Sequence, residues 1–472
     1  MIIWQLISLS AIILVLLNIF IDSDVYNEQS LVAILLLGAV ALICYIIDGR
    51  RYNTIRGKII RPSWLLIFGM SIIVFQNSID LLLNNLHLGS SIFPHQNIIV
   101  KGVAYGAIAI TSFIIGYILP YRPFKPSTSA PTPTSLRPFI VLSALFMAGF
   151  ILTLDADFFS GKSYIESGNI STSRTKISEV FLWVTLAAFF IQYAINSRGK
   201  ELSFKQYIKG IPTLMLAIFI LYILLKLVGG MREPVLRNIL LFTFSYIYAS
   251  RRSPVKTITF LIAIVAASFI FSIVSIGRGV ITDDLTEKYR VGMEVYDGRN
   301  SISPTTSELA NSQYCDFIAI KHFDKEGNPH IGGAMQARYI AVTFIPNRIL
   351  NNFWSVETDM QGSAYYLTAR DRGLKSESGL GSTIHTDFYV DFGIAGMIIC
   401  MILVGFIFKK CDLTLYSNRN FRYSLLITVL VISLGASSLY LSRSTLIPTL
   451  KIPFYTYILL LINQRFNLSN TK

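Results

Sequence analysis

The chain has 472 residues, of which 53% are hydrophobic and 14% are charged, and its mean hydropathy is +0.56. A soluble globular domain carries about 25% charged residues, and a soluble fold this apolar would expose large hydrophobic patches. The composition therefore excludes a cytosolic enzyme, a free nucleic-acid-binding protein and a secreted disulfide scaffold, for which four cysteines are also too few. It predicts an all-α polytopic membrane protein.

Stretches of about 20 mostly apolar residues predict the membrane-spanning helices. The first stretch, from Ile2 to Ile21, is long enough to span and no Lys or Arg precedes it, so we interpret it as a helix and not as a cleavable signal peptide. About twelve spans are expected, near residues 2–21, 31–47, 63–83, 98–119, 139–154, 179–195, 211–228, 235–250, 257–276, 391–408, 423–441 and 445–463.

The basic residues predict how the chain is oriented in the membrane. Of the 41 Lys and Arg residues, 21 lie in alternate connections between predicted spans or in the C-terminal tail, accompanied by only three acidic residues. Because cytoplasmic connections collect Lys and Arg, we expect these connections and both termini to be cytoplasmic. Membrane orientation then accounts for the net charge of +14, and nucleic acid is not expected as a partner.

One long segment, residues 277–390, is predicted on the opposite, periplasmic side. It is rich in aromatic residues, so we expect it to fold rather than to be disordered. Helices are expected over 334–348 and 361–372, ended by Pro346 and Gly373.

This pattern divides the chain into three parts. Residues 1–276 hold about nine helices, residues 277–390 form the periplasmic loop, and residues 391–472 hold about three helices. A linker rich in Pro, Ser and Thr over 127–135 is expected to separate the first four helices from the rest.

Two arginine motifs lie at predicted outer ends of spans. Arg232 belongs to the short turn GGMREPVLR, and Arg237 of the same turn would lie inside the next span, where a charge needs a partner or water. The alternative is that both side chains reach back to the membrane interface. Arg278 lies between two glycines, which let a backbone approach a ligand closely, although a helix C-cap would also place them there.

Further candidates lie in the periplasmic loop. Arg348 ends the motif FIPNR, and Arg338 precedes it by ten residues; Arg338 could instead belong to a solvated helix face.

The segment GLGSTIHTDFYVDFG leads the loop back into the membrane. If 383–392 is helical, Asp387 and Asp391 share a face. His385, Asp387 and Tyr389 so close together are typical of a site, whereas a carboxylate near a helix N-terminus is also stabilised by the helix dipole alone. Three more charged residues lie in or at the ends of predicted spans with no evident partner: Asp80, Lys226 and Lys451.

Several arginines that face one carboxylate have a chemical meaning. Guanidinium groups bind phosphate bidentately and stay charged, and a carboxylate can accept a proton from an attacking hydroxyl. A phosphate-bearing lipid on the outer face of a bacterial membrane is the natural ligand. Arginines could also stabilise a diphosphate leaving group without a metal ion or cofactor.

The order of these motifs resembles that of the Wzy-type O-antigen polysaccharide polymerases. The resemblance rests on GMREPVL, IGRG, FIPNR and GLGSTIHTDFYVDFGIAG, over roughly residues 225–400, and on about twelve spans with one long late outer loop. It implies a GT-C-like helical fold, shared with O-antigen ligases, in the inner membrane of a Gram-negative bacterium.

The resemblance also implies a reaction. The growing glycan would be transferred from one undecaprenyl diphosphate onto the sugar of another lipid-linked repeat unit. The diphosphate would be held by Arg232, Arg278 and Arg348, with Arg338 as a further candidate, and Asp387 or His385 would act as the base. Besides the lipid-linked oligosaccharides and membrane lipids, a chain-length regulator and a flippase are possible partners.

Two alternatives stay open. An O-antigen ligase has a similar design and a different acceptor, and sequence separates it poorly from a polymerase. A lipid-linked oligosaccharide flippase or another transporter would concentrate its polar groups near the bilayer midplane. Here they gather at the predicted outer surface, which favours the enzyme.

Overall fold

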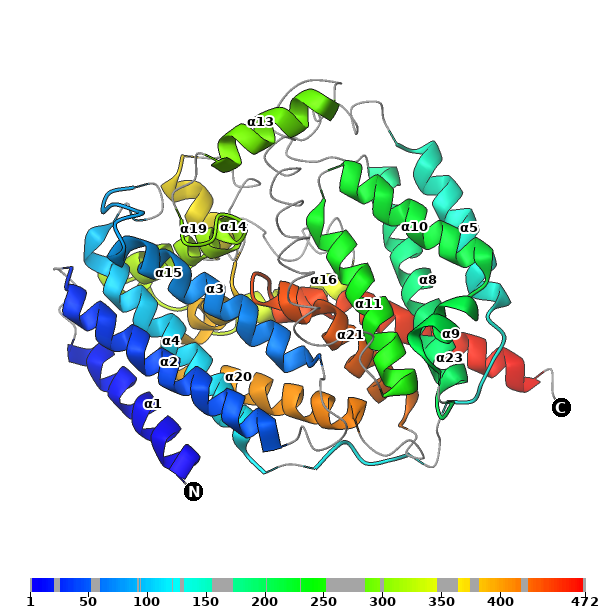
Figure 1. Ribbon diagram of the computed structural model, residues 1–472, viewed down its shortest axis with the longest axis horizontal. Helices are drawn as coiled ribbons and strands as arrows, with labels where there is room; N and C mark the ends of the chain where they lie inside the picture. The colour runs from blue at the N-terminus through cyan, green and yellow to red at the C-terminus, as the bar shows by residue number, and fades with distance from the viewer. Residues whose placement is uncertain are drawn as a thin grey trace.

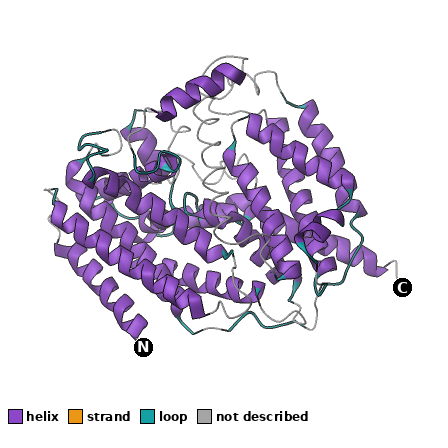
Figure 2. Ribbon diagram, viewed as in Figure 1, coloured by secondary structure: helices purple, strands orange, loops and turns teal. Residues whose placement is uncertain are grey.

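All elements that the computed structural model describes are helices (Figures 1 and 2). The described residues are 2–20, 26–51, 60–90, 93, 95–120, 122–127, 131–154, 173–200, 202–229, 231–251, 285–297, 301–345, 364–373, 382–416 and 423–469. The apolar helices are α1 (Ile2–Phe20), α2 (Glu28–Arg51), α3 (Pro62–Leu82), α4 (Ile99–Ile118), α5 (Arg137–Leu152), α8 (Ser173–Ser197), α10 (Thr213–Val228), α11 (Arg232–Ser250), α20 (Ile384–Leu415), α21 (Leu425–Leu441) and α23 (Lys451–Ser469).

Shorter helices complete the fold. These are η1 (Gln96–Ile98), α9 (Phe204–Lys209), α13 (Leu285–Asp297), α14 (Ser307–Ala310), η2 (Asn311–Gln313), α15 (Tyr314–Ile320), η3 (Lys321–Lys325), α16 (Ala334–Phe344), α19 (Ala364–Asp371) and α22 (Leu446–Thr449).

The predicted all-helical membrane architecture is confirmed. Among the described residues, seven segments are long and apolar enough to cross a membrane, and they contain α1, α2, α3, α4, α8, α20 and α23. Helices α5, α10 and α21 are shorter apolar helices. A helix lies at each predicted span except 257–276, which falls outside the described residues.

Helices far apart in the sequence form one body. Figure 1 shows α1–α4 with α20 on one side, and α5, α8, α10, α11 and α23 on the other. Helix α20 packs most extensively against α4, and α21 packs against both α3 and α11. The expected separation of the first four helices by the linker is therefore wrong, because α20 completes their bundle.

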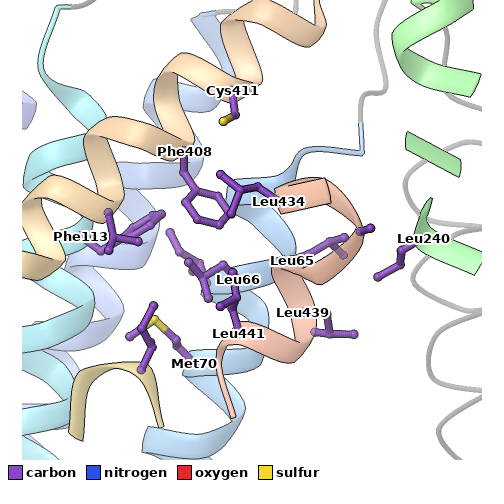
Figure 3. Packing of buried hydrophobic residues seen from close by; sticks show 14 of the residues in the cluster. Leu65, Leu66, Met70, Phe113, Leu240, Phe408, Cys411, Leu434, Leu439 and Leu441 are labelled. Carbon is purple, nitrogen blue, oxygen red and sulfur yellow. The ribbon is translucent and has the colours of Figure 1, made fainter. Parts of the chain in front are cut away.

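Two glycines explain why α4 and α20 approach so closely. A side chain at Gly116 would overlap the backbone oxygen of Ile402, and one at Gly405 would overlap that of Phe113. Small residues let membrane helices pack backbone to backbone. The hydrophobic core continues where α3, α20 and α21 meet, through residues such as Leu66, Phe408 and Leu434 (Figure 3).

Helix α20 changes direction near its start. Gly393 adopts φ +68°, a left-handed conformation that L-residues rarely adopt, and it separates Ile384–Phe392 from the long membrane-spanning part. Thr383 caps the N-terminus by accepting the Thr386 N–H, so the helix begins at Ile384, seven residues before the predicted span 391–408.

The helices expected in the loop are present but shorter. α16 ends at Phe344, two residues before Pro346, and α19 spans Ala364–Asp371 and is followed by Gly373 at φ +63°. Because α14, α15 and α19 pack at one end of the membrane helices, we call this the loop end.

Candidate functional site

A cavity of about 160 Å³ opens at the loop end between α3, α11, α14 and α21. We call it the arginine cavity because two arginines line it, Arg232 at the start of α11 and Arg443 just after α21. Arg232 forms an ion pair with Glu308, and its side chain is still 27% exposed. Thr305, Thr306 and Tyr440 add hydroxyl groups to the wall. Glu233 also lines the wall, but it pairs with Arg237 at 2.9 Å. With this carboxylate paired, the two arginines leave a cavity that can take up an anionic group.

Arg443 was missed in the sequence, although a signal for it exists. It lies in the short connection between the apolar stretches 423–441 and 445–463, on the side opposite the one that the charge pattern predicts to be cytoplasmic. A basic residue in a short outer connection runs against the usual distribution of charge. That exception could have marked it as a candidate.

The loop is joined to α3 by polar contacts beside this cavity. Asp80 accepts the Ser301 hydroxyl at 2.6 Å and the Ile302 N–H at 2.7 Å. Gln76 donates to the Ser303 carbonyl at 2.9 Å. Asp80, which had no evident partner in the sequence, therefore holds the loop in place.

A buried histidine–carboxylate pair lies at the start of α20. His385 Nε2 lies 3.0 Å from Asp316 Oδ2, and the other oxygen of Asp316 accepts the hydroxyls of Thr383 and Thr386. His385 and Asp316 are 1% and 3% exposed. Within the described residues, Nδ1 of His385 has no hydrogen-bond partner. If Nε2 carries the proton that Asp316 accepts, Nδ1 keeps a free lone pair.

The sequence gives no signal for Asp316, because it lies 69 positions before His385. Only the packing of α15 against α20 brings the two together. Arg443 and Arg372 lie close by. Burial and Asp316 raise the pKa of the neighbouring Cys315 thiol, and the two guanidinium groups oppose that rise. Arg443 of the arginine cavity therefore acts on the thiol of Cys315, the residue that precedes Asp316 on α15.

Asp387 faces a different element. Its carboxylate accepts the Gln336 side-chain amide at 2.9 Å and the Tyr339 hydroxyl at 3.3 Å, both from α16. Asp391 lies on the same face and accepts the backbone N–H groups of Met335 and Gln336 at 3.1 and 3.0 Å. It therefore stabilises the N-terminus of α16.

The three neighbouring residues of the HTDFY segment do not form one cluster. His385 contacts Asp316 on α15 and Asp387 contacts α16, whereas Tyr389 donates to Asp324 at 2.5 Å. Burial favours the neutral form of Asp324, but hydrogen bonds from Lys101, Tyr105 and Tyr389 outweigh it and hold its pKa below the usual range.

Of the predicted diphosphate ligands, Arg232 and Arg338 can be placed, whereas Arg278 and Arg348 lie outside the described residues. Arg338 is 3% exposed, so the alternative that it belongs to a solvated face is wrong. It is close enough to Tyr339 to oppose the rise in pKa that burial and Asp387 impose on that phenol. Arg338 lies on α16 between Gln336 and Tyr339, the two residues that contact Asp387, and Arg232 belongs to the arginine cavity.

Two other charges have partners of their own. Arg237 pairs with Glu233 at 2.9 Å and lies 4.8 Å from the centre of the Tyr440 ring. Lys226 pairs with Glu179 at 2.7 Å.

Among the described residues, no group of three or more His, Cys, Asp or Glu side chains could hold a metal ion. In comparisons with known proteins, no family model, no curated protein and no solved structure matches the chain.

Proposed function

We propose that this protein polymerises undecaprenyl-diphosphate-linked O-antigen repeat units at the periplasmic face of the inner membrane. The observation that carries the proposal is a cavity lined by Arg232 and Arg443 at the loop end, where the buried His385–Asp316 pair also lies. An anion-binding cavity and a potential proton acceptor at the same end of the protein are what transfer from a lipid diphosphate requires. The resemblance of the motifs to Wzy-type polymerases supplies the choice of substrate.

In this proposal the arginines act on the leaving group. Arg232 and Arg443 bind the diphosphate of the donor lipid, and Arg278 and Arg348 remain candidates from the sequence. The negative charge that develops as the sugar–phosphate bond breaks is then met by guanidinium groups that are already in place. The protein therefore needs no metal ion or cofactor for this step.

The base removes a proton from the acceptor. The acceptor hydroxyl attacks the anomeric carbon of the donor glycan, the bond to the diphosphate breaks, and undecaprenyl diphosphate leaves. His385 is the better base, because Nδ1 has no partner among the described residues while both Asp387 oxygens already accept hydrogen bonds. Since His385 is 1% exposed, the acceptor has to open this cluster.

The remaining architecture follows from the same proposal. The chain would have about twelve spans and a GT-C-like fold, with the loop end in the periplasm and both termini in the cytoplasm. A chain-length regulator and a flippase would work beside it.

The lipopolysaccharide gel profile of a strain that lacks the gene tests the proposal. We expect core that bears a single repeat unit, and a restored ladder when the wild-type gene is supplied. The Arg443→Ala protein should insert into the membrane normally, but its gene should not restore the lipopolysaccharide ladder. The gene for Arg290→Ala, which removes an exposed arginine from α13, should restore the ladder. Bare core without any repeat unit would reject the polymerase and favour a ligase or a flippase.

A further inference from the structure

An apolar groove of about 720 Å³ opens between α5, α8, α16 and α23, and the proposed reaction does not use it. Its walls are formed by Leu142, Phe146, Ile177, Val180, Phe181, Val184, Thr185, Val342, Phe344, Ile345, Lys451, Tyr455, Ile458, Leu459 and Ile462. Among the described residues that line the groove, Lys451 is the single charged one.

The hydrogen bonding of Lys451 is weak for an ammonium group in an apolar site. It is the first residue of α23, and its Nζ donates to the Val342 carbonyl over a long distance of 3.5 Å. The neighbouring Tyr455 donates to the Thr343 carbonyl at 2.7 Å and fixes α23 against the end of α16. A lysine at the edge of the bilayer is favoured where an anion can meet it.

The groove has the length of one leaflet. From Lys451 to Ile462 the lining follows one face of α23, and these eleven residue steps cover about 17 Å. The hydrocarbon core of a bilayer is about 30 Å thick, so half of it is about 15 Å. A lipid with its head group at Lys451 would lay its tails along the groove as far as the bilayer midplane.

We propose that this groove binds a phospholipid with a single negative charge, its phosphate at Lys451 and its tails against α8 and α23. One ammonium group matches one phosphodiester charge, and the lining holds no acidic residue that would repel it. The diphosphate of the donor lipid has its own arginines elsewhere, so the groove and the arginine cavity select different head groups. This inference does not depend on the proposed reaction.

The test places the purified full-length chain in nanodiscs that contain both phosphatidylglycerol and phosphatidylcholine. Native mass spectrometry then measures how much of each lipid stays bound to the protein. We expect wild-type protein to prefer phosphatidylglycerol by about fivefold, the contribution of one lysine near the membrane surface. Lys451→Gln should reduce that preference to about one, and Lys451→Arg should keep it. Val180→Trp, which fills the groove, should lower the retention of both lipids.

Matched variants keep the result interpretable. Lys209→Gln removes an exposed lysine from α9, and Ile12→Trp adds bulk to the exposed face of α1; neither should change the preference or the retention. The proposal is overturned if Lys451→Gln keeps the preference, since Lys451 would then only stabilise the end of α16. Recovery of undecaprenyl phosphate in place of phosphatidylglycerol, or of a cross-linked segment of the chain itself, would overturn it as well.

Discussion

The two ends of α20 hold their charged residues in different ways. At the end away from the loop, Lys409 Nζ lies 3.5 Å from Asp48 Oδ2, and Asp412 accepts the Tyr117 hydroxyl at 2.8 Å with the buried Arg61 nearby. These partners all come from α2 and α4 or from the residue that precedes α3. Opposite charges are paired between neighbouring helices, which is an arrangement that holds a bundle together.

At the loop end, the polar side chains of α20 contact the loop, and Tyr389 also packs against Tyr105 of α4, with the ring centres 4.9 Å apart. His385 meets α15, whereas Asp387 and Asp391 meet α16. Arg232 and Arg443 line a cavity at this end. The comparison teaches that the charged residues at one end of α20 join helices of the bundle, whereas those at the other end hold the loop. The proposed function assigns the chemistry to the loop end, and the predictions below test that division.

The largest effect on stability is expected at the end away from the loop. Lys409→Met leaves Asp48 buried without its ion-pair partner, so the free energy of unfolding should fall by about 3–5 kcal/mol. Unfolding in mixed detergent micelles measures it. Lys410→Met is the control, because its ammonium group lies over the Phe124 and Phe406 rings at a half-buried site, and it should cost about 1 kcal/mol or less. If both variants lowered the free energy of unfolding by the same amount, the Lys409–Asp48 pair would have no special role in stability.

The next effect concerns activity at the loop end. Arg443→Ala should lower the polymerisation rate by about 100-fold with little change in folded protein, because a charged donor to the leaving group is lost. Arg443→Lys should recover part of the rate, since the charge remains without the bidentate geometry. Rates are compared per folded molecule, with Arg290→Ala as the exposed control. Full activity of Arg443→Ala would remove Arg443 from the site.

A smaller loss of stability is expected at the bend of α20. Gly393→Ala forces an L-residue into φ +68° and brings its Cβ within 3.1 Å of the His330 ring, so the loss should be about 1–2 kcal/mol. Thermal unfolding measures it. Gly149→Ala in α5 is the matched control, because its Cβ meets nothing closer than 3.4 Å and alanine favours a helix. A stabilising Gly393→Ala would show that the bend is not required.

The smallest effect is a loss of stability that we expect when the pH is lowered. Burial alone would raise the pKa of Asp371, but hydrogen bonds from Lys321, Tyr314 and His95 outweigh it and hold the pKa below the usual range. This carboxylate therefore contributes stability above its unfolded pKa near 4, and the contribution is lost as the pH falls through its lower folded value. Wild-type protein should lose up to about 1 kcal/mol more than Asp371→Asn below pH 4. The same pH dependence of the free energy of unfolding in the two proteins would contradict this prediction.

Hydropathy predicts most of the helices, because the bilayer demands long apolar segments with satisfied backbones. A helix lies at each predicted span that the structure describes. The packing order could not be predicted in the same way. The approach of α4 to α20 depends on Gly116 and Gly405, which lie far apart in the sequence and are informative only as a pair.

The candidate site was predictable in part. Arg232 and His385 stand out locally, one in a short turn and the other at a helix start. Asp316 and Glu308 do not, because their roles arise when the loop folds back onto α20 and α11. The closeness of His385, Asp387 and Tyr389 in the sequence predicted a single site. Once the segment is helical, the three side chains contact three different partners.

The most direct test of the central claim uses the purified chain in liposomes with a radiolabelled undecaprenyl-diphosphate-linked repeat unit and no nucleotide sugar. We expect wild-type protein to produce a ladder of lipid-linked polymer and Arg443→Ala to leave the single unit unchanged. A wild-type protein that moves the repeat unit across the bilayer without forming a new glycosidic bond would contradict the polymerase account.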